Sequence, residues 1–261
     1  MNDFTPRLVA LDIDGTLVDH DGVLPPSVTQ AVRRVVDAGV PVVLATGRAW
    51  HSTRVIADAL DLPEGPHICS NGAVIISYPP VRVHETVTFD PSDVVRAAAR
   101  LNPDAAIAVE EVGVGFRLNR LFPEGDLSGE MVLSSIDDLA SRPVTRVVVR
   151  DPNGSAVDFK RMAEKLGMHP VSYFIGWSNW LDIAPQGVDK AAGLARVCEL
   201  VGVGREDVLA LGDGHNDIEL LTWAGRGVAL GDAPAEVQAA ADHVTGLFDD
   251  GGTAGELLRW F

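Results

Sequence analysis

Residues 9–17 of the chain read VALDIDGTL. The segment starts with apolar residues typical of a strand buried on both faces. It ends with two carboxylates, Asp12 and Asp14, followed by a Gly-Thr pair. In an open parallel sheet, ligands bind beyond the carboxyl ends of the strands. We therefore expect a parallel sheet whose polar site begins at these two aspartates.

The chain around this stretch alternates apolar strands with amphipathic helices. The pattern predicts strands over residues 7–13, 41–46, 66–70, 73–77, 207–213 and 227–230, and helices over residues 27–39, 48–60, 187–202, 215–225 and 233–241. Such alternation is typical of a parallel sheet with helices on both faces. We expect an α/β fold whose core is a Rossmann-like parallel sheet.

The middle of the chain has a different rhythm and is richer in strands. Strands are predicted over residues 81–89, 145–151, 171–177 and 180–185, with two more within 105–120, and helices over residues 92–101, 134–140 and 155–167. Prolines and a glycine at residues 79–80 and 185–187 are typical of hinges between domains. We expect one domain from residues 1–80 and 184–261, and an inserted α+β domain from residues 81–183.

Composition and charge narrow the class of protein. The chain has 261 residues and a formal net charge of −16. Its apolar runs are shorter than the roughly 20 residues that span a membrane, so no membrane partner is expected. An acidic surface repels the phosphates of nucleic acid, so nucleic acid is not expected as a partner either. The N-terminal residues lack the composition of a signal peptide. We expect a cytoplasmic protein with Cys69 and Cys198 reduced.

Two further polar clusters follow strands of the predicted sheet. In Thr46-Gly47-Arg48, a hydroxyl, a glycine and the N–H groups of the next helix suit a phosphate group. Residues 212–217, GDGHND, place two carboxylates and an amide in one turn. Helix capping by Thr46, or by Asp213 with Asn216, is the alternative. Capping accounts poorly for the presence of both Asp213 and Asp217.

Lys190 lies near the start of a predicted helix, where a cation opposes the helix dipole. It is one of only three lysines in the chain, which favours an anion beside it over simple exposure to solvent. Asp12, Asp213 and Asp217 would repel one another at one edge of the sheet, and a divalent cation relieves that repulsion. Oxygen ligands favour Mg²⁺ over zinc. Such a site suits a phosphoryl group, with one carboxylate as nucleophile and its neighbour as acid and base.

These motifs, in this order, resemble those of the haloacid dehalogenase (HAD) superfamily of aspartate-nucleophile phosphatases. The matching segments are DIDGT at 12–16, TGR at 46–48, PQGVDK at 185–190 and GDGHND at 212–217. The inserted domain resembles the class II cap of subtype B. SNGA at 70–73 and IAPQGVDK at 183–190 resemble the Cof-type branch. The resemblance implies a HAD-like catalytic core and a cap that selects the substrate.

The resemblance also implies a role for each matching residue. Asp12 would be the nucleophile that forms an aspartyl-phosphate, and Asp14 the general acid and then the general base. Mg²⁺ would be held by Asp12, the backbone carbonyl of Asp14 and Asp213, with Asp217 nearby or acting through water. The phosphate would be bound by Thr46, Gly47 and Lys190, with support from Asn216.

Substrate contacts are less constrained by the motifs. Arg48 and Asn71 would orient the site or reach the substrate, and Arg117 and Asn179 are candidates in the inserted domain. An exposed surface position is the alternative for the arginine. Two positions depart from the resembled pattern: Gly214 stands where serine is common, and Asp182 where glutamate is common.

Together these features predict a Mg²⁺-dependent phosphatase of phosphomonoesters. The resemblance implies small metabolites, sugar phosphates among them, as substrates. A phosphotransferase or phosphomutase with the same aspartyl-phosphate is an alternative. A phosphoacceptor module without turnover is another, although such a module has no need of Asp14 as acid or base. The expected partner is a small phosphorylated metabolite, and the expected assembly is a monomer or a weak homodimer.

Overall fold

The computed structural model describes residues 4–151, 171–176 and 180–261, and for 171–176 it describes the backbone only. The helix predicted over 155–167 and the candidate Asn179 lie outside the described residues. The chain separates into two compact units. Unit 1 consists of Met1–Arg48, Thr53–His84 and Asp189–Phe261, and unit 2 of Ala49–Ser52 and Glu85–Val188.

Unit 1 is built on a five-stranded parallel sheet with the order β14-β13-β12-β1-β2. Its strands are β1 (Leu8–Leu11), β2 (Val42–Leu44), β12 (Val208–Gly212), β13 (Arg226–Ala229) and β14 (His243–Val244). β1 pairs with β2 on one side and with β12 on the other. The strand order therefore reverses at β1, and in an open α/β sheet such a reversal is where the ligand site forms.

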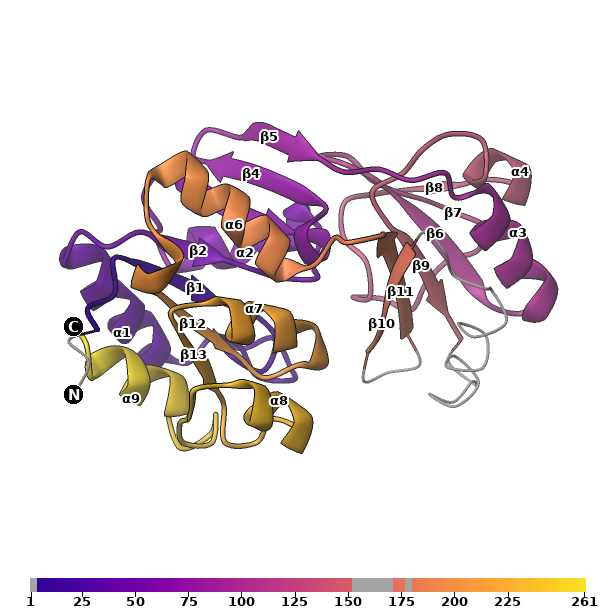
Figure 1. Cartoon of the computed structure of the whole chain (residues 1–261). Coiled ribbons are helices and arrows are strands. Elements are labelled where there is room, and N and C mark those ends of the chain that lie inside the picture. The colour runs from indigo at the N-terminus through magenta and orange to yellow at the C-terminus, as the bar shows by residue number, and fades with distance from the viewer. Residues whose placement is uncertain (1–3, 152–170, 177–179) are drawn as a thin grey trace. The chain divides into compact units, whose positions relative to one another are not determined.

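Helices cover both faces of this sheet, which explains why β1 is apolar throughout. Val9 and Leu11 face a core shared with α1 (Pro26–Asp37), α2 (Trp50–Ala59) and α9 (Gly252–Leu258). Leu8 and Ala10 face a second core shared with α6 (Lys190–Val201), α7 (Ile218–Trp223) and α8 (Ala235–Ala240). α1 and α9 lie side by side (Figure 1).

A second sheet of unit 1, with the order β3-β4-β5, continues from β2. Its strands are β3 (Gly65–Cys69), β4 (Val74–Tyr78) and β5 (Arg82–Thr86). Ala45 and Ile68 form a bridge, and the Thr46 N–H donates to the Ile68 carbonyl at 2.9 Å. The buried imidazole of His67 extends this junction, because its Nδ1 accepts the N–H of Leu44 at 3.3 Å.

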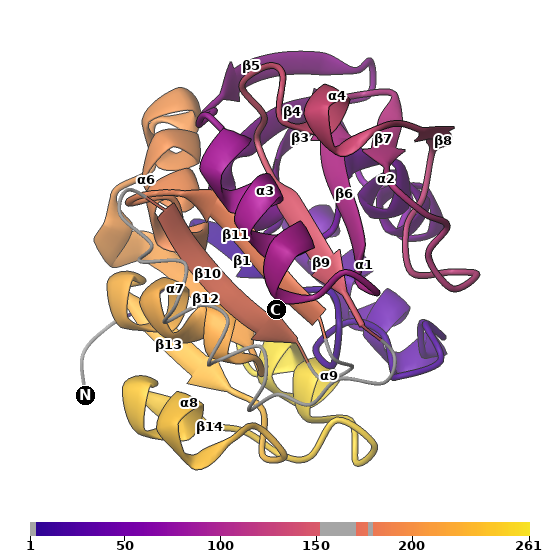
Figure 2. The ribbon, with the colours of Figure 1, turned by 90° about the vertical axis from the view of Figure 1, so that its right-hand side faces the viewer.

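Unit 2 has a six-stranded sheet with the order β10-β11-β9-β6-β7-β8. Its strands are β6 (Ala106–Glu111), β7 (Gly115–Leu118), β8 (Glu130–Leu133), β9 (Val147–Arg150), β10 (Val171–Gly176) and β11 (Trp180–Pro185). The pairing is antiparallel except between β7 and β8. α3 (Ser92–Leu101) and α4 (Ile136–Leu139) pack on one face of the sheet, and Figure 2 shows α3 in front of β6 and β9.

The predicted fold class is confirmed: a parallel α/β core and a strand-rich α+β portion. Three elements were not predicted, namely β8, β14 and α9. β8 is mostly exposed and so lacks an alternating apolar pattern, β14 has two residues, and α9 contains two glycines. The helix predicted over 215–225 begins at Ile218, because His215–Asp217 form a 3-10 turn. Among the described residues, no helix combines the length and the apolar character needed to cross a membrane.

Candidate active site

The turn after β1 presents Asp12 at the end of the strand. The N–H groups of residues 17 and 18 both donate to the Ile13 carbonyl, at 2.8 and 3.0 Å, so the chain reverses directly after Asp12. Gly15 has a φ of 79°, a conformation that favours glycine. A Cβ at Gly15 would also overlap the carboxylate of Asp213. Glycine therefore permits the turn and leaves room for a carboxylate from another strand.

The turn after β12 is organised by Asp217. Its Oδ2 accepts the backbone N–H groups of Asp213 and Gly214, at 3.2 and 2.9 Å. The Asp217 side chain is fully buried. Asp217 thus satisfies N–H groups of the turn itself, whereas the side chains of Asp213 and Asn216, the alternative caps, bond to Thr16 and Asn71.

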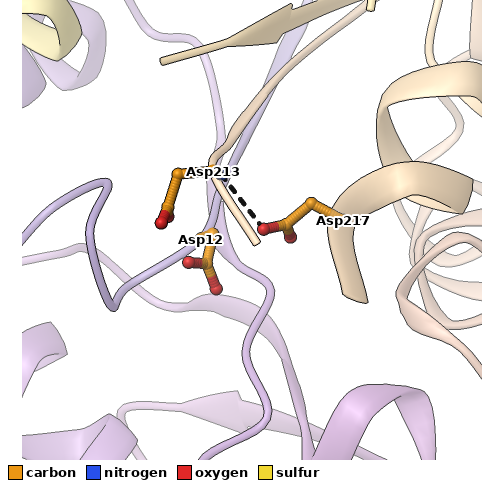
Figure 3. Close-up of side chains that lie close together, drawn as sticks. All are labelled: Asp12, Asp213 and Asp217. Atoms are coloured by element: carbon orange, nitrogen blue, oxygen red, sulfur yellow. Dashed lines mark hydrogen bonds between the residues drawn. The ribbon is translucent and has the colours of Figure 1, made fainter. Parts of the chain in front are cut away.

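Asp12, Asp213 and Asp217 converge at the ends of the two neighbouring strands (Figure 3). Each offers one carboxylate oxygen, and these oxygens all lie within 4.8 Å of one another. All three residues are buried. The hydroxyl of Thr16 donates to Asp213 Oδ1 at 2.9 Å and holds that carboxylate in place. The predicted acidic cluster is therefore formed by residues about 200 positions apart.

Lys190 is the first residue of α6, and its ammonium group is the cation of this cluster. Nζ donates to Asp12 Oδ1 at 2.6 Å and to Asp217 Oδ1 at 2.7 Å, and the side chain is fully buried. Asp189 caps the helix by accepting the N–H of Ala192 at 2.7 Å. The anions beside Lys190 are carboxylates, which satisfy the ammonium where the helix dipole is unfavourable.

One lysine cannot neutralise three carboxylates, and the pKa values of Asp12 and Asp213 are raised accordingly. Burial, reinforced by the charge of Asp217 and opposed by Lys190, raises the pKa of Asp12 well above its usual range. Burial and the charge of Asp217 raise the pKa of Asp213 to about 7. Burial alone would lower the pKa of Lys190, but Asp12 and Asp217 outweigh it and hold the pKa above its usual value. The cluster therefore favours the uptake of positive charge.

Residues 46–48 form the loop for which the sequence predicts phosphate binding. Thr46 is fully buried, and its hydroxyl accepts the N–H of Arg48 at 3.1 Å. The Asn71 N–H donates to the Thr46 carbonyl at 3.0 Å. A Cβ at Gly47 would lie only 3.1 Å from Asn71 Oδ1, so glycine lets the loop pass close to that side chain.

Asn71 connects this loop to the turn after β12. Its Oδ1 accepts a hydrogen bond from Asn216 Nδ2 at 2.9 Å. Ser70 and Asn71 have φ values of 52° and 53°, in the left-handed region that non-glycine residues rarely adopt. Both residues are buried. Strain of this kind costs on the order of 1–3 kcal/mol per residue and persists where the surroundings impose it, often at functional sites.

Arg48 and Asp14 form a bidentate ion pair. Arg48 Nε donates to Asp14 Oδ2 at 3.0 Å, and Nη2 donates to Oδ1 at 2.6 Å. The Asp14 side chain is 62% exposed, whereas Asp12 is buried. The two aspartates of DIDGT thus differ in environment: one is enclosed with the acidic cluster, and the other faces solvent with an arginine as its partner.

The described residues of unit 2 that the sequence analysis singled out form hydrogen bonds with other residues of that unit. Arg117 Nε donates to Glu111 Oε1 at 2.6 Å, and Nη1 donates to the Asp138 carbonyl, on the sheet face that α3 and α4 cover. Its predicted role as a substrate contact has no support in these hydrogen bonds. Asp182, singled out as a departure from the resembled pattern, forms a buried bidentate pair with Arg146 at 2.6 and 2.8 Å. The aspartate that stands in place of the more common glutamate therefore pairs with an arginine.

Thr16 is a residue of this site that the sequence analysis did not assign. It lies within the DIDGT motif, which was the available signal, but its bond to Asp213 joins segments that only the folded chain brings together. The structure brings the other predicted residues of unit 1 together around the acidic cluster, in segments joined by hydrogen bonds. They are Thr46, Arg48, Asn71, Lys190 and Asn216.

Comparison with known proteins identifies the family. A family model described as haloacid dehalogenase-like hydrolase matches residues 9–257. The chain belongs to this family. The hydrolase is 27% identical over 281 residues to the 5-amino-6-(5-phospho-D-ribitylamino)uracil phosphatase YitU of Bacillus subtilis, covering 98% of each chain. It is 30% identical over 264 residues to the pyridoxal phosphate phosphatase YbhA of Escherichia coli, covering 93% of this chain and 94% of that one.

A solved structure agrees with this assignment. The crystal structure of a haloacid dehalogenase-like hydrolase from Bacteroides thetaiotaomicron matches 98% of this chain and 100% of its own, with 26% identity and a TM-score of 0.84. The hydrolase is a phosphatase of this family, as the motifs predicted. Its relatives are named for different phosphorylated metabolites, so family membership leaves its own substrate open.

Proposed function

We propose that this phosphatase hydrolyses phosphomonoesters of small metabolites, sugar phosphates among them, through a phosphoryl group carried on Asp12 and with Mg²⁺ as cofactor. The observation that carries the proposal is the buried cluster of Asp12, Asp213 and Asp217 around Lys190. It combines a carboxylate nucleophile, a cation and a net negative charge that a divalent metal balances.

The residues of the cluster fit a divalent cation. Asp12 Oδ1 is occupied by Lys190 and Asp213 Oδ1 by Thr16, which leaves the second oxygen of each as the candidate ligand. Asp217 already accepts hydrogen bonds at both oxygens, so we assign it to positioning Lys190 and the turn, with any metal contact through water. The carbonyl of Asp14 completes the proposed protein ligands. A bound Mg²⁺ would supply charge neutralisation for these carboxylates and for the oxygens of a phosphoryl group.

In the first proposed step, an oxygen of Asp12 forms a bond to phosphorus and the bond between phosphorus and the leaving oxygen breaks. Lys190 favours the ionised, nucleophilic form of Asp12, because its charge opposes part of the rise in pKa that burial and Asp217 cause. A bound divalent cation would favour that form further. Asp14 gives a proton to the leaving oxygen. Because Asp14 is paired with Arg48, this ion pair must open before Asp14 acts as an acid.

In the second proposed step, Asp14 takes a proton from a water molecule, whose oxygen attacks phosphorus. The bond between phosphorus and Asp12 breaks, which releases inorganic phosphate and regenerates the carboxylate. Thr46, Gly47 and Lys190 would bind the phosphoryl oxygens, with Asn216 held in position by Asn71. Arg48, once released from Asp14, is a cation available for the substrate.

We further propose that unit 1 is the catalytic core and that unit 2 selects the substrate. Unit 2 runs mainly from Glu85 to Val188, a few residues later at each end than the inserted domain of residues 81–183 that the sequence predicts. The support is that every residue assigned to catalysis, metal or phosphate binding belongs to unit 1. Loops and inserted domains commonly carry specificity on such a scaffold.

The proposal is tested by phosphate release from a panel of phosphorylated sugars, polyols, nucleotides and cofactors, with Mg²⁺ and with EDTA. Release that requires the metal and is lost in Asp213→Asn supports the proposal. Release that EDTA leaves unchanged, from protein freed of metal, contradicts the cofactor assignment. Transfer of the phosphoryl group to a second metabolite without inorganic phosphate would instead indicate a phosphotransferase or phosphomutase.

A further inference from the structure

The first turn of α9 reaches the loop that follows β1. The hydroxyl of Thr253 donates a hydrogen bond to the carbonyl of Thr16 at 2.6 Å, although the two residues are 237 positions apart. Their exposed fractions are 1% and 0%, so water does not compete for either group. A short hydrogen bond in a buried site fixes the backbone that accepts it.

Thr16 connects Thr253 to the acidic cluster, because its own side chain bonds to Asp213. Its hydroxyl donates to Asp213 Oδ1 at 2.9 Å, and the same carboxylate occupies the space where a Cβ of residue 15 would lie. Residues 15 and 16 therefore define where the Asp213 carboxylate lies. The N–H groups of residues 15, 17 and 18 hold the loop locally, at 2.8 to 3.0 Å, whereas the N–H of Thr16 reaches the Ile13 carbonyl only at 3.4 Å. The bond from Thr253 therefore adds a constraint at Thr16, where the local bond is longest.

Thr253 is itself held on a rigid element. Ala254 and Leu257 of α9 belong to the same core cluster as β1 and α1. At the start of the helix, Thr245 donates to the Gly252 carbonyl at 3.1 Å. Gly252 lies so close to the Gly246 carbonyl that a Cβ would not fit. A support of this kind keeps a ligand in one orientation.

We propose that Thr253 is a positioning residue that sets the affinity of the acidic cluster for its divalent cation, by fixing Thr16 and through it Asp213. The inference rests on the proposed function, in which Asp213 holds the metal. Removal of a group that bonds directly to a metal ligand, as Thr16 does to Asp213, typically changes the metal affinity by about 10- to 100-fold. Thr253 acts one bond further out, so we expect an effect near the lower end of that range. A purely structural threonine would change stability and leave that affinity alone.

The test measures the binding of Mn²⁺, which reports on the site without turnover. Electron paramagnetic resonance counts the free ion during a titration of the protein, and competition with Mg²⁺ gives the affinity for that metal. Thr253→Val keeps the shape of the side chain and removes the hydroxyl, and we expect Mn²⁺ binding to be weaker by about 10-fold. Thr253→Ser restores the hydroxyl and is expected to bind like the wild type.

Thr245→Val is the matched control. It removes a threonine hydroxyl that bonds to the start of α9 but does not reach the loop after β1, so we expect unchanged Mn²⁺ affinity. Should Thr253→Val not fold, as judged by circular dichroism, Thr253→Ala compared with Thr253→Ser makes the same test.

Thr253→Val that melts at a lower temperature and yet binds Mn²⁺ like the wild type would overturn the inference. Equal weakening in Thr253→Val and Thr245→Val would also overturn it, because the effect would then follow the stability of α9. A failure of the metal proposal is a separate result, recognised by wild-type protein that does not bind Mn²⁺ or by Asp213→Asn that binds it normally.

Discussion

Lys190 shares its buried ammonium between Asp12, at 2.6 Å, and Asp217, at 2.7 Å. The lysine thereby couples the end of β1 to the turn after β12. It also supplies the only positive charge among the four buried groups of the cluster in the described part of the chain. Removing it leaves two carboxylates buried without their counter-ion.

Lys190→Met is therefore expected to affect both stability and catalysis. Breaking a buried ion pair on one side costs about 3–5 kcal/mol of unfolding free energy. The loss of a positioned cation is expected to lower kcat by at least about 100-fold. Urea unfolding and phosphate release measure the two effects.

Arg196→Met in the same helix is the control. Arg196 forms an ion pair with Glu199 in which both side chains are more than half exposed, so its removal is expected to cost less than about 1 kcal/mol. Similar losses in the two variants would contradict the central place given to Lys190.

Asp14→Asn is expected to slow the phosphatase according to the leaving group. An alkyl phosphate needs a proton on its leaving oxygen, whereas 4-nitrophenyl phosphate loses a good leaving group without one. Positioned acid catalysis is worth about 10²- to 10⁴-fold, so kcat/KM for the alkyl ester is expected to fall by that factor, and for the aryl ester by much less.

The ratio of the two kcat/KM values in wild type and variant decides this prediction. Equal losses for both esters would remove Asp14 from the role of general acid. A folded variant with wild-type rates on both would remove it from the mechanism altogether.

Two substitutions of Asn71 distinguish the effect of its strained backbone from the effect of its side chain. Asn71→Gly relieves the left-handed conformation at φ 53° and deletes the hydrogen bond to Asn216. Asn71→Ala deletes the same bond and keeps the strain. A lost hydrogen bond of this type is worth about 1 kcal/mol, so both variants are expected to raise KM by roughly fivefold.

Stability is expected to distinguish the two Asn71 variants, with the alanine less stable than the glycine by about 1 kcal/mol. Thermal unfolding and the KM for the best substrate of the panel provide the measurements. An unchanged KM in Asn71→Gly would assign Asn71 to the backbone alone.

His67 makes stability depend on pH. Burial lowers its pKa from 6.5 to about 4, and its Nδ1 accepts the Leu44 N–H, which an imidazolium cannot do. Between those two pH values the unfolded chain binds a proton that the folded chain does not, so stability falls as the pH falls through this window. The slope approaches about 1.4 kcal/mol per pH unit and totals about 3 kcal/mol.

His67→Asn keeps an acceptor near the position of Nδ1 and removes the titration. The unfolding free energy of wild type minus that of this variant, measured in urea from pH 7 to pH 4.5, is expected to decrease as the pH is lowered. The contribution of carboxylates to the pH dependence is the same in both proteins and cancels in this difference. A pH-independent difference would show that His67 does not titrate in this window.

The sequence predicted the core of the fold because the relevant signals are local. The buried run of β1 and its alternation with helices predict a parallel sheet, and its strand ends predict that Asp12 and Asp213 meet. Family membership inferred from the motifs is confirmed by the match over residues 9–257. The specific roles of the site residues stay predictions, to be decided by the variants above.

What the sequence did not predict are contacts that depend on side-chain direction across large separations. Nothing local in the chain indicates that Thr253 reaches Thr16 or that Asn216 reaches Asn71. Capping by Asp213 and Asn216 was the alternative for this turn, because Asp and Asn are both favoured caps, whereas in the fold Asp217 accepts the N–H of Gly214 at the start of the 3-10 turn. α9 went unpredicted because glycines weaken its helical pattern, and tertiary packing supplies the missing stability.

The central claim is that Asp12 carries the phosphoryl group. The most direct measurement is an acid quench of the phosphatase during turnover of 4-nitrophenyl phosphate with Mg²⁺, followed by mass spectrometry of the peptide that contains residues 9–17, for wild type and Asp12→Asn. The account predicts a phosphoryl group on Asp12 in the wild type, and neither adduct nor phosphate release in a variant that is still folded. Phosphate release by Asp12→Asn at a rate near that of the wild type, or a phosphoryl group on another residue, would contradict it.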